Sequence, residues 1–291
     1  MEALPWILLA LSASIASVKN ILVKGLSSLS FKTREFFGVQ ALIFGAGSIV
    51  LLTVNLFNFS GISLFTLLLS LAYGTMLIGA QWFYVLALTK GKTAVCATIY
   101  SFGFVIPTLS GWLFWGEELS LFAIIGIIIV FPVLIISGTG KSEEGKEKDD
   151  KKYIFYLIIA MLCSGGLGIV QKIQQKSAYA NETTTFILLS FILGLIVSLI
   201  FFFTKKRGES GGITKKSAGI SALVGVCYSV CNMMNTHLAG VLDSAIFFPA
   251  INIGSIVISM IFGMIIYKEK LNIRDIVVLC LGAIAIALVN L

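Results

Sequence analysis

The sequence predicts an all-α integral membrane protein in which ten transmembrane helices form two inverted five-helix repeats around a central cavity. Three observations predict this fold class: ten apolar stretches of membrane-spanning length, an alternating distribution of positive charge, and a match of the chain to itself at a fixed offset. The composition agrees, because 58% of the 291 residues are hydrophobic, only 12% are charged and the mean hydropathy is +1.01. Soluble domains carry about 25% charged residues, so an ordinary soluble domain is excluded.

Each apolar stretch holds about 20 residues, the length that an α-helix needs to cross roughly 30 Å of hydrocarbon. The predicted helices span residues 4–24, 35–57, 63–88, 93–115, 119–137, 153–176, 183–204, 216–239, 244–266 and 272–290. The first stretch has no basic region before it and no clear cleavage site of small residues after it. We therefore expect it to persist as a helix rather than to be removed as a signal peptide.

Positive charge alternates between the two sides of the predicted helices. Of the 21 Lys and Arg residues, 19 lie in or beside the first, third, fifth, seventh and ninth connections, whereas Lys172 and Lys176 lie on the other side. Because Lys and Arg stay on the cytoplasmic face during insertion, the odd connections are predicted inside and both termini outside a cell membrane. Lys outnumbers Arg 18 to 3, which is typical of an AT-rich bacterial genome, and for a bacterial protein the predicted location is the inner membrane. The net charge of +7 reflects this bias and indicates no nucleic-acid partner.

The chain divides at residues 138–152, where five acidic residues and five Lys lie together. This composition predicts a solvated cytoplasmic linker between a first five-helix repeat, 1–137, and a second five-helix repeat, 153–291. A shift of the chain by about 152 residues aligns the two repeats without gaps. Because five is odd, the second repeat must cross the membrane in the opposite sense to the first. Inverted repeats of this kind are typical of secondary transporters.

A short motif closes the fourth predicted helix. It comprises Pro107, Gly111, Gly116, Glu117, Leu119, Ser120 and Gly126. A weaker copy, 152 residues later, keeps Gly263, Glu269 and Leu271 but has Lys268 where the first copy has Gly116. The motif resembles the repeat signature of the EamA group in the drug/metabolite transporter (DMT) superfamily. The resemblance implies a ten-helix transporter whose cavity is lined by its first, third, fourth, sixth, eighth and ninth helices. We interpret the two Glu residues as capping or topology residues, with gating as the alternative.

Polar side chains deep within predicted membrane helices usually face a cavity or another helix. In the eighth predicted helix, Tyr228, Asn232 and Asn235 share one face at i, i+4 and i+7. The other residues predicted to bind substrate are Asn252 and Ser255, which follow a possible helix break at Pro249, together with Gln81, Tyr84, Tyr100 and Lys19. The alternative is that the amides join helices through hydrogen bonds of about 0.6 kcal/mol each.

Lys19 and Lys172 lie within predicted helices, away from the terminal residues of those helices. Lys19 precedes the inner end of the first helix, so its ammonium is expected either to extend to the membrane interface or to contact an anionic group. Lys172 lies near the outer end of the sixth helix, where we expect its ammonium to reach the interface. All 14 acidic residues lie at helix ends, in loops or in tails. Because small multidrug exporters of the superfamily rely on a membrane Glu, this pattern disfavours proton-coupled export of lipophilic cations.

We therefore predict a secondary transporter that moves a small polar metabolite, such as an amino acid or a similar zwitterionic or neutral solute, by alternating access. One alternative is an exporter of organic cations or drugs bound by an aromatic cavity. Another is a channel or a non-transporting membrane scaffold. No residue pattern indicates an enzyme, a metal site or a cofactor. The expected partners are the small-molecule substrate and the lipid bilayer, for a chain that is a monomer or a homodimer.

Overall fold

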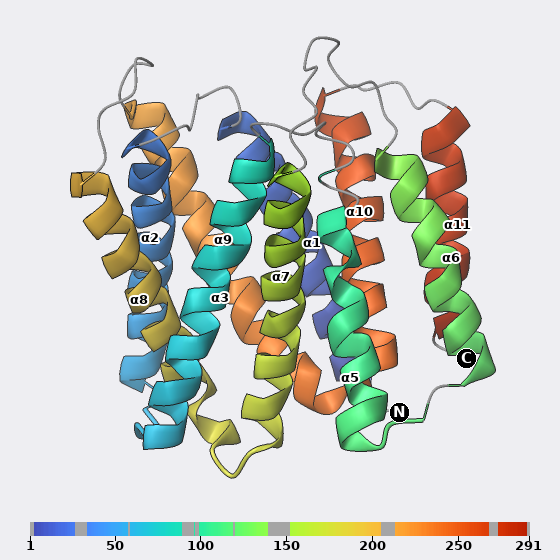
Figure 1. Cartoon of the computed structure of the whole chain (residues 1–291), viewed down its shortest axis with the longest axis horizontal. Coiled ribbons are helices and arrows are strands. Elements are labelled where there is room, and N and C mark those ends of the chain that lie inside the picture. The colour runs from blue at the N-terminus through green and yellow to red at the C-terminus, as the bar shows by residue number, and fades with distance from the viewer. Residues whose placement is uncertain are drawn as a thin grey trace.

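The computed structural model describes residues 3–26, 34–57, 59–88, 96, 99–118, 120–138, 152–204, 213–267 and 273–289. Within these ranges the chain is helical and forms no strand. The helices stand roughly side by side (Figure 1). Residues 139–151 of the predicted linker, most of the weaker motif copy, and Leu119 of the first motif lie outside the described residues. The ends of the predicted linker, Gly138 and Lys152, belong to α6 and α7.

The α-helices lie close to the predicted ranges. In chain order they are α1 (Leu4–Leu26), α2 (Arg34–Phe57), α3 (Leu64–Leu88), α5 (Val105–Trp115), α6 (Leu121–Gly138), α7 (Lys152–Lys176), α8 (Thr183–Thr204), α9 (Lys215–Val241), α10 (Ser244–Tyr267) and α11 (Ile273–Val289). Two short 3-10 turns, η1 (Phe102–Phe104) and η2 (Ala180–Glu182), precede α5 and α8. The largest difference is at the fourth predicted helix, whose start lies mostly outside the described residues.

Several helices have the length and composition of membrane spans. Six apolar segments in the described residues are long enough to cross a membrane: Leu4–Val23, Arg34–Phe57, Leu64–Ala87, Tyr153–Lys176, Ala180–Thr204 and Lys215–Val241. Shorter apolar helices accompany them at Ile99–Trp115, Leu121–Pro132 and Ser244–Ile258. Large apolar side chains are exposed on the outside of the molecule, among them Phe57 and Phe114. Such a surface fits contact with lipid rather than with water.

Proline has different effects in the fourth and ninth predicted helices. Pro107 follows η1, and its missing N–H and its ring disfavour a regular α-helical bond to the carbonyl of Gly103. The tighter 3-10 turn at this point is a common response to such a conflict. Pro249, in contrast, lies within a continuous α10, so the structure shows no helix break there.

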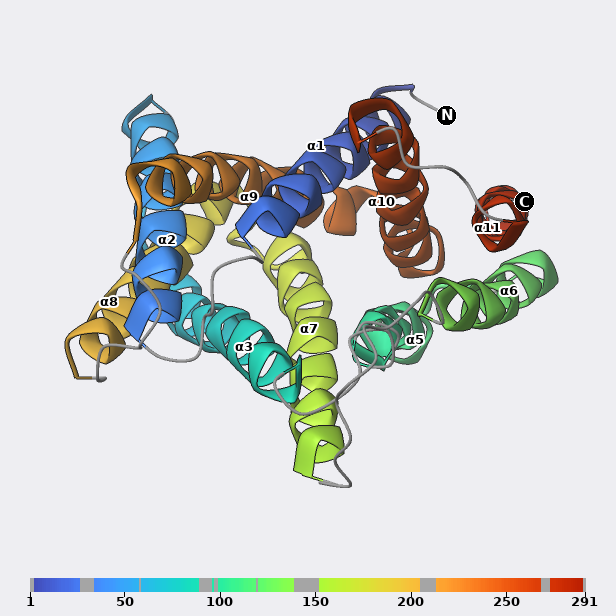
Figure 2. The same ribbon diagram turned by 90° about the horizontal axis from the view of Figure 1, so that it is seen from above.

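The helices form two packed regions that share central elements. Figure 2 shows α2 and α8 at one end of the molecule, α6 and α11 at the other, and α1, α7, α9 and α10 between them. The contacts agree, because α2 packs on α8 and α9, α3 packs on α7 and α8, and α6 packs on α11. One apolar core centres on Phe191 and Leu51, and the other on Phe247 and Leu238.

Glycines allow the closest helix crossings. A Cβ on Gly165 of α7 would lie 2.6 Å from the carbonyl oxygen of Gly103, so the backbones of α7 and η1 meet almost directly. A Cβ on Gly225 of α9 would overlap the carbonyl oxygen of Ile43 in α2. Larger side chains at these positions would separate the helices that carry the polar residues described next.

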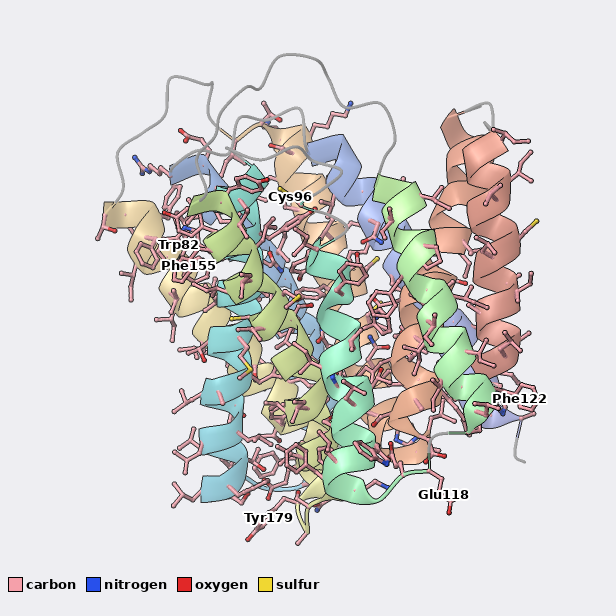
Figure 3. All side chains as sticks on the ribbon, turned by 45° about the vertical axis from the view of Figure 1, so that its right-hand side comes forward. Trp82, Cys96, Glu118, Phe122, Phe155 and Tyr179 are labelled. Atoms are coloured by element: carbon pink, nitrogen blue, oxygen red, sulfur yellow. The ribbon has the colours of Figure 1, made fainter. Side chains whose placement is uncertain are left out.

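The two faces of the molecule hold different helix ends. α1 begins and α11 ends toward the lower face in Figure 1. Trp82 and Cys96 lie toward the upper face, whereas Tyr179 and Glu118 lie at the lower face (Figure 3).

Candidate functional site

Three groups of polar residues inside the helix assembly bear on function. We refer to them as the Lys19 cluster (Lys19, Gln81, Tyr84, Tyr100 and Tyr228), the Asn232 network (Tyr73, Gln171, Asn232 and Thr236) and the Glu117 ion pair (Glu117, Lys172 and Ser244). The first group holds five of the nine residues predicted to bind substrate.

The Lys19 cluster is built around a cation on an aromatic ring. Lys19 of α1 places its Nζ 5.0 Å from the ring centroid of Tyr228 on α9. Tyr228 is the middle residue of α9, so about 20 Å of helix separates it from either end of that element. The ammonium therefore lies against the middle of α9 rather than at the membrane interface. An ammonium over an aromatic face is attracted by the ring quadrupole.

Three more predicted site residues surround Tyr228. Gln81 of α3 is hydrogen-bonded to the Tyr228 side chain, and Tyr100 is near enough to interact with it electrostatically. The rings of Tyr84 and Tyr100 pack with their centroids 4.6 Å apart. Tyr100 is also hydrogen-bonded to Ser164 of α7. All five members of the cluster are half-buried, so each keeps some accessible surface.

Lys19 has no acidic partner in the described part of the chain. The groups that act electrostatically on its ammonium are Cys231 and Cys227, and neither is a carboxylate. The cluster thus combines one cation, three aromatic rings and one amide. Such a set can bind an anion or a polar group, but the described cluster has no general acid–base pair or metal-ligand set that would indicate catalysis.

The Asn232 network joins three helices through buried hydrogen bonds. The Tyr73 hydroxyl of α3 donates to Oδ1 of Asn232 on α9 at 2.5 Å. Gln171 of α7 donates to the Tyr73 hydroxyl at 2.8 Å and to Oγ1 of Thr236 at 3.1 Å. Nδ2 of Asn232 donates to the carbonyl of Tyr228 at 2.8 Å. All four side chains are buried, so Asn232 has the contacts expected of an amide that joins helices.

Two of the three remaining predicted residues, Asn235 and Ser255, are hydrogen-bonded to α1. Ser12 of α1 donates to Oδ1 of Asn235 at 2.6 Å, and Ser17 donates to the carbonyl of Ser255 at 2.9 Å. Nδ2 of Asn252 donates to the carbonyl of Phe248 in its own helix at 2.9 Å. These bonds attach α1 to α9 and α10, and they hold the helix that carries Lys19.

The Glu117 ion pair lies where α5, α7 and α10 meet. Lys172 is buried, and its ammonium pairs with Oε1 of Glu117 and donates to Oγ of Ser244 at 2.5 Å. Oε2 of Glu117 accepts the backbone N–H of Ser244, the first residue of α10, at 2.8 Å. A carboxylate at a helix N-terminus is favourable because of the helix dipole. The prediction that Lys172 extends to the interface is wrong, because Glu117 lies within reach of its ammonium inside the protein.

The close contacts of Gly111 explain why the motif at the end of the fourth predicted helix has a glycine at this position. A Cβ at this position would overlap the Glu117 carboxylate and lie 2.5 Å from the Cβ of Ser244. After Trp115, Gly116 takes a left-handed conformation with φ of 63°, and the N–H of Glu117 donates to the carbonyl of Gly111 at 3.2 Å. The tight turn directs Glu117 back toward α7. The capping role expected of Glu117 is therefore exerted on α10 rather than on its own helix.

The ion pair borders a cleft of about 550 Å³ at the end of the molecule. The cleft is lined by Trp115, Gly116, Glu117, Glu118, Lys176 and Asp243. None of the residues predicted to bind substrate lines it. Glu118 and Lys176 are exposed, in contrast to their buried neighbours in the ion pair.

Sequence reasoning missed Tyr73, Gln171 and Thr236. A signal for Tyr73 was present, because Tyr73, Gln81 and Tyr84 fall on one side of α3 at i, i+8 and i+11. No spacing rule could pair Glu117 with Lys172, since these residues lie 55 positions apart on different helices.

The sequence of the second half resembles a known family. Residues 151–291, a little less than half of the chain, match the EamA-like transporter family. EamA-like proteins are part of the DMT superfamily of membrane transporters. Together with the apolar helices, this match supports a multi-pass membrane protein.

Two individual proteins resemble this chain. An uncharacterized protein of Haemophilus influenzae is 28% identical over 173 residues, which cover 57% of this chain and 56% of that protein. The match thus spans little more than half the length of the relative. A solved crystal structure, described only as that of a protein, shares 14% sequence identity and superposes with a TM-score of 0.74 over 97% of this chain and 94% of its own. That likeness shows a shared fold.

Proposed function

We propose that this protein is an EamA-like secondary transporter that carries a small polar metabolite, such as an amino acid, across the cell membrane by alternating access. The observation that supports this most is the Lys19 cluster. It brings half-buried polar side chains of α1 and α3 against Tyr228, halfway along α9. Polar groups at this depth are expensive in a membrane protein unless they serve a cavity or a pathway. We place the substrate in contact with this cluster, near Asn235, Asn252 and Ser255.

The helix contacts support an inverted repeat. If each of the first five α-helices is exchanged with its counterpart in the second half, the α3–α7 contact becomes the α9–α1 contact, and α2–α9 becomes α8–α3. Both members of each pair are present, and the contacts α2–α8, α5–α10 and α6–α11 map onto themselves. Two halves related in this way can exchange conformations around a fixed central site.

The Glu117 ion pair fits the closed end of such a carrier. Glu117 belongs to the first half of the chain, whereas Lys172 and Ser244 belong to the second, so the pair joins the halves. Alternating access requires that contacts of this kind form at one end of the molecule and separate when that end opens. With the topology indicated by positive charge, this end faces outward and both termini lie outside, in a bacterial inner membrane.

Flux into proteoliposomes tests the proposal. Purified protein is reconstituted, loaded with each standard L-amino acid in turn, and assayed for uptake of the labelled compound. A carrier gives saturable uptake and counterflow with at least one compound, and protein-free liposomes give neither. Linear flux that does not saturate would show a channel instead, and absence of protein-dependent flux with amino acids and other small polar metabolites would contradict the proposed function.

A further inference from the structure

Two lysines lie among the helices, and their ammonium groups have different partners. Lys172 contacts a carboxylate, a hydroxyl and, at 5.3 Å, the ring of Trp115. Lys19 has an equivalent aromatic contact, at 5.0 Å from the ring of Tyr228, but no carboxylate in the described part of the chain. The two sites thus share a lysine and an aromatic ring, and Lys19 lacks the anion.

The missing anion can come from a ligand, because the surroundings of Lys19 remain partly accessible. Lys172 is fully buried, whereas Lys19, Tyr228 and Gln81 are half-buried. A lone ammonium at this depth is costly, and contact with an aromatic face compensates only part of the cost. A bound anion would supply the remainder, as Glu117 does for Lys172.

The surroundings also restrict the type of anion. One lysine balances one negative charge, so a carboxylate fits better than a doubly charged phosphate. No arginine fork, which favours bidentate phosphate binding, lies against Lys19 in the described residues. Gln81 and Tyr100 lie close by and can hydrogen-bond the carboxylate oxygens.

We infer that Lys19 binds the carboxylate of the transported substrate, which is therefore a small monocarboxylate or an amino acid in zwitterionic form. The inference rests on the proposed function and specifies the substrate class for it. In the amino-acid case, the ammonium group lies against the faces of Tyr84 and Tyr100, since the described cluster has no acidic side chain to receive it.

Matched acids and amides test this inference. The melting temperature of the purified protein is measured with each standard L-amino acid and with its amide, and then with the corresponding 2-oxo acids. Ligands that bind the native state raise the melting temperature by mass action. The same series is applied to Lys19→Met, to Lys19→Arg and to Lys216→Met, whose lysine is exposed at the start of α9.

We expect at least one acid to stabilise the wild type more strongly than its amide does. Lys19→Met should bind that acid roughly thirtyfold more weakly, whereas Lys19→Arg keeps the preference and Lys216→Met behaves as the wild type. Stabilisation by an amino acid but not by its 2-oxo acid assigns the zwitterion, and the reverse assigns the simple carboxylate.

Two results would overturn the inference: no acid preferred over its amide by the wild type, or an unchanged preference in Lys19→Met. Either result leaves the proposed function open to its own test, because counterflow by the wild type shows a carrier whichever residue binds the substrate. The melting temperature of ligand-free Lys19→Met shows that the variant is folded. Lys19→Gln, with a shorter polar side chain, provides a second neutral variant.

Discussion

Lys19 and Lys172 have the same kind of side chain but occupy two different kinds of site. Lys172 is enclosed by Glu117, Ser244 and Trp115, and none of its surface reaches solvent. Lys19 meets the ring of Tyr228 and remains half-buried. A cation whose partners all belong to the protein holds elements together, whereas a cation with an unused position can receive a ligand. The comparison separates a structural lysine from a binding lysine within one chain.

The polar residues around each lysine follow the same division. The Asn232 network is fully buried and its amides bond to other protein groups, as the side chains of the Glu117 ion pair do. The members of the Lys19 cluster are half-buried, and their contacts are mainly aromatic. Depth along a helix is therefore a weaker indicator of a binding site than the number of hydrogen-bonding positions left unused.

The largest expected effect is on the stability that the Glu117 ion pair provides. Lys172→Met leaves the Glu117 carboxylate at a helix junction without its cation, which should lower the free energy of unfolding by about 3–5 kcal/mol. Denaturant unfolding of the protein in detergent measures this change in free energy. The double variant Lys172→Met with Glu117→Gln should recover part of the loss, because no unpaired charge remains. Lys176→Met and Glu118→Gln change exposed neighbours and should have little effect; a loss as large in these controls would contradict a role specific to the pair.

A smaller effect is expected from Gly111→Ala. The added methyl overlaps the Glu117 carboxylate and crowds Ser244, so it should cost about 1–3 kcal/mol of stability. Gly219→Ala is the matched control, because its Cβ would meet nothing within 4 Å on α9. Replacing a helical Gly by Ala at an open position should stabilise by roughly 0.5–1 kcal/mol. If Gly111→Ala stabilises the protein as Gly219→Ala does, Gly111 is not needed for the ion pair.

At the Lys19 cluster, Tyr228→Leu removes the ring against which the Lys19 ammonium is positioned. A less well positioned ammonium should bind the carboxylate more weakly by about 1 kcal/mol, or roughly fivefold. Tyr228→Phe keeps the ring and loses the hydroxyl that bonds to Gln81, so the expected loss is smaller. Isothermal titration with the acid found in the melting experiments measures both affinities. Equal losses in the two variants would assign the effect to the hydroxyl and not to the ring.

The smallest effect is expected in the Asn232 network. Tyr73→Phe removes the hydroxyl that donates to Asn232, and a hydrogen bond between membrane helices contributes about 0.6 kcal/mol. The change should appear in unfolding free energy and leave acid binding unchanged. In a double-mutant cycle with Asn232→Ala, the two losses should be less than additive, because both remove the same bond. A strong loss of acid binding in Tyr73→Phe would contradict this prediction and would show that the Asn232 network is part of the binding site.

The helices could be predicted from the sequence because each contains a run of apolar residues long enough to show its own boundaries. The fate of individual polar residues could not, since it depends on which distant helix lies opposite. Asn232 and Tyr228 share one face of α9, yet Asn232 meets Tyr73 of α3 while Tyr228 receives Lys19 of α1. Lys172 looked free to reach the interface because Glu117 is remote in sequence. Pro249 predicted a break that α10 does not show.

The lone charge on Lys19 also has an electrical consequence. An ammonium at mid-depth lies within the membrane field, which acts on one elementary charge with about 2.3 kcal/mol per 100 mV across the full bilayer. The Glu117 ion pair carries no net charge, so the field does little to open or close it. A bound zwitterionic amino acid leaves the net positive charge of the Lys19 cluster in place, so voltage acts on the loaded and the empty protein alike. A simple monocarboxylate makes the cluster neutral, and voltage then acts mainly on the empty carrier, during the return step of the cycle.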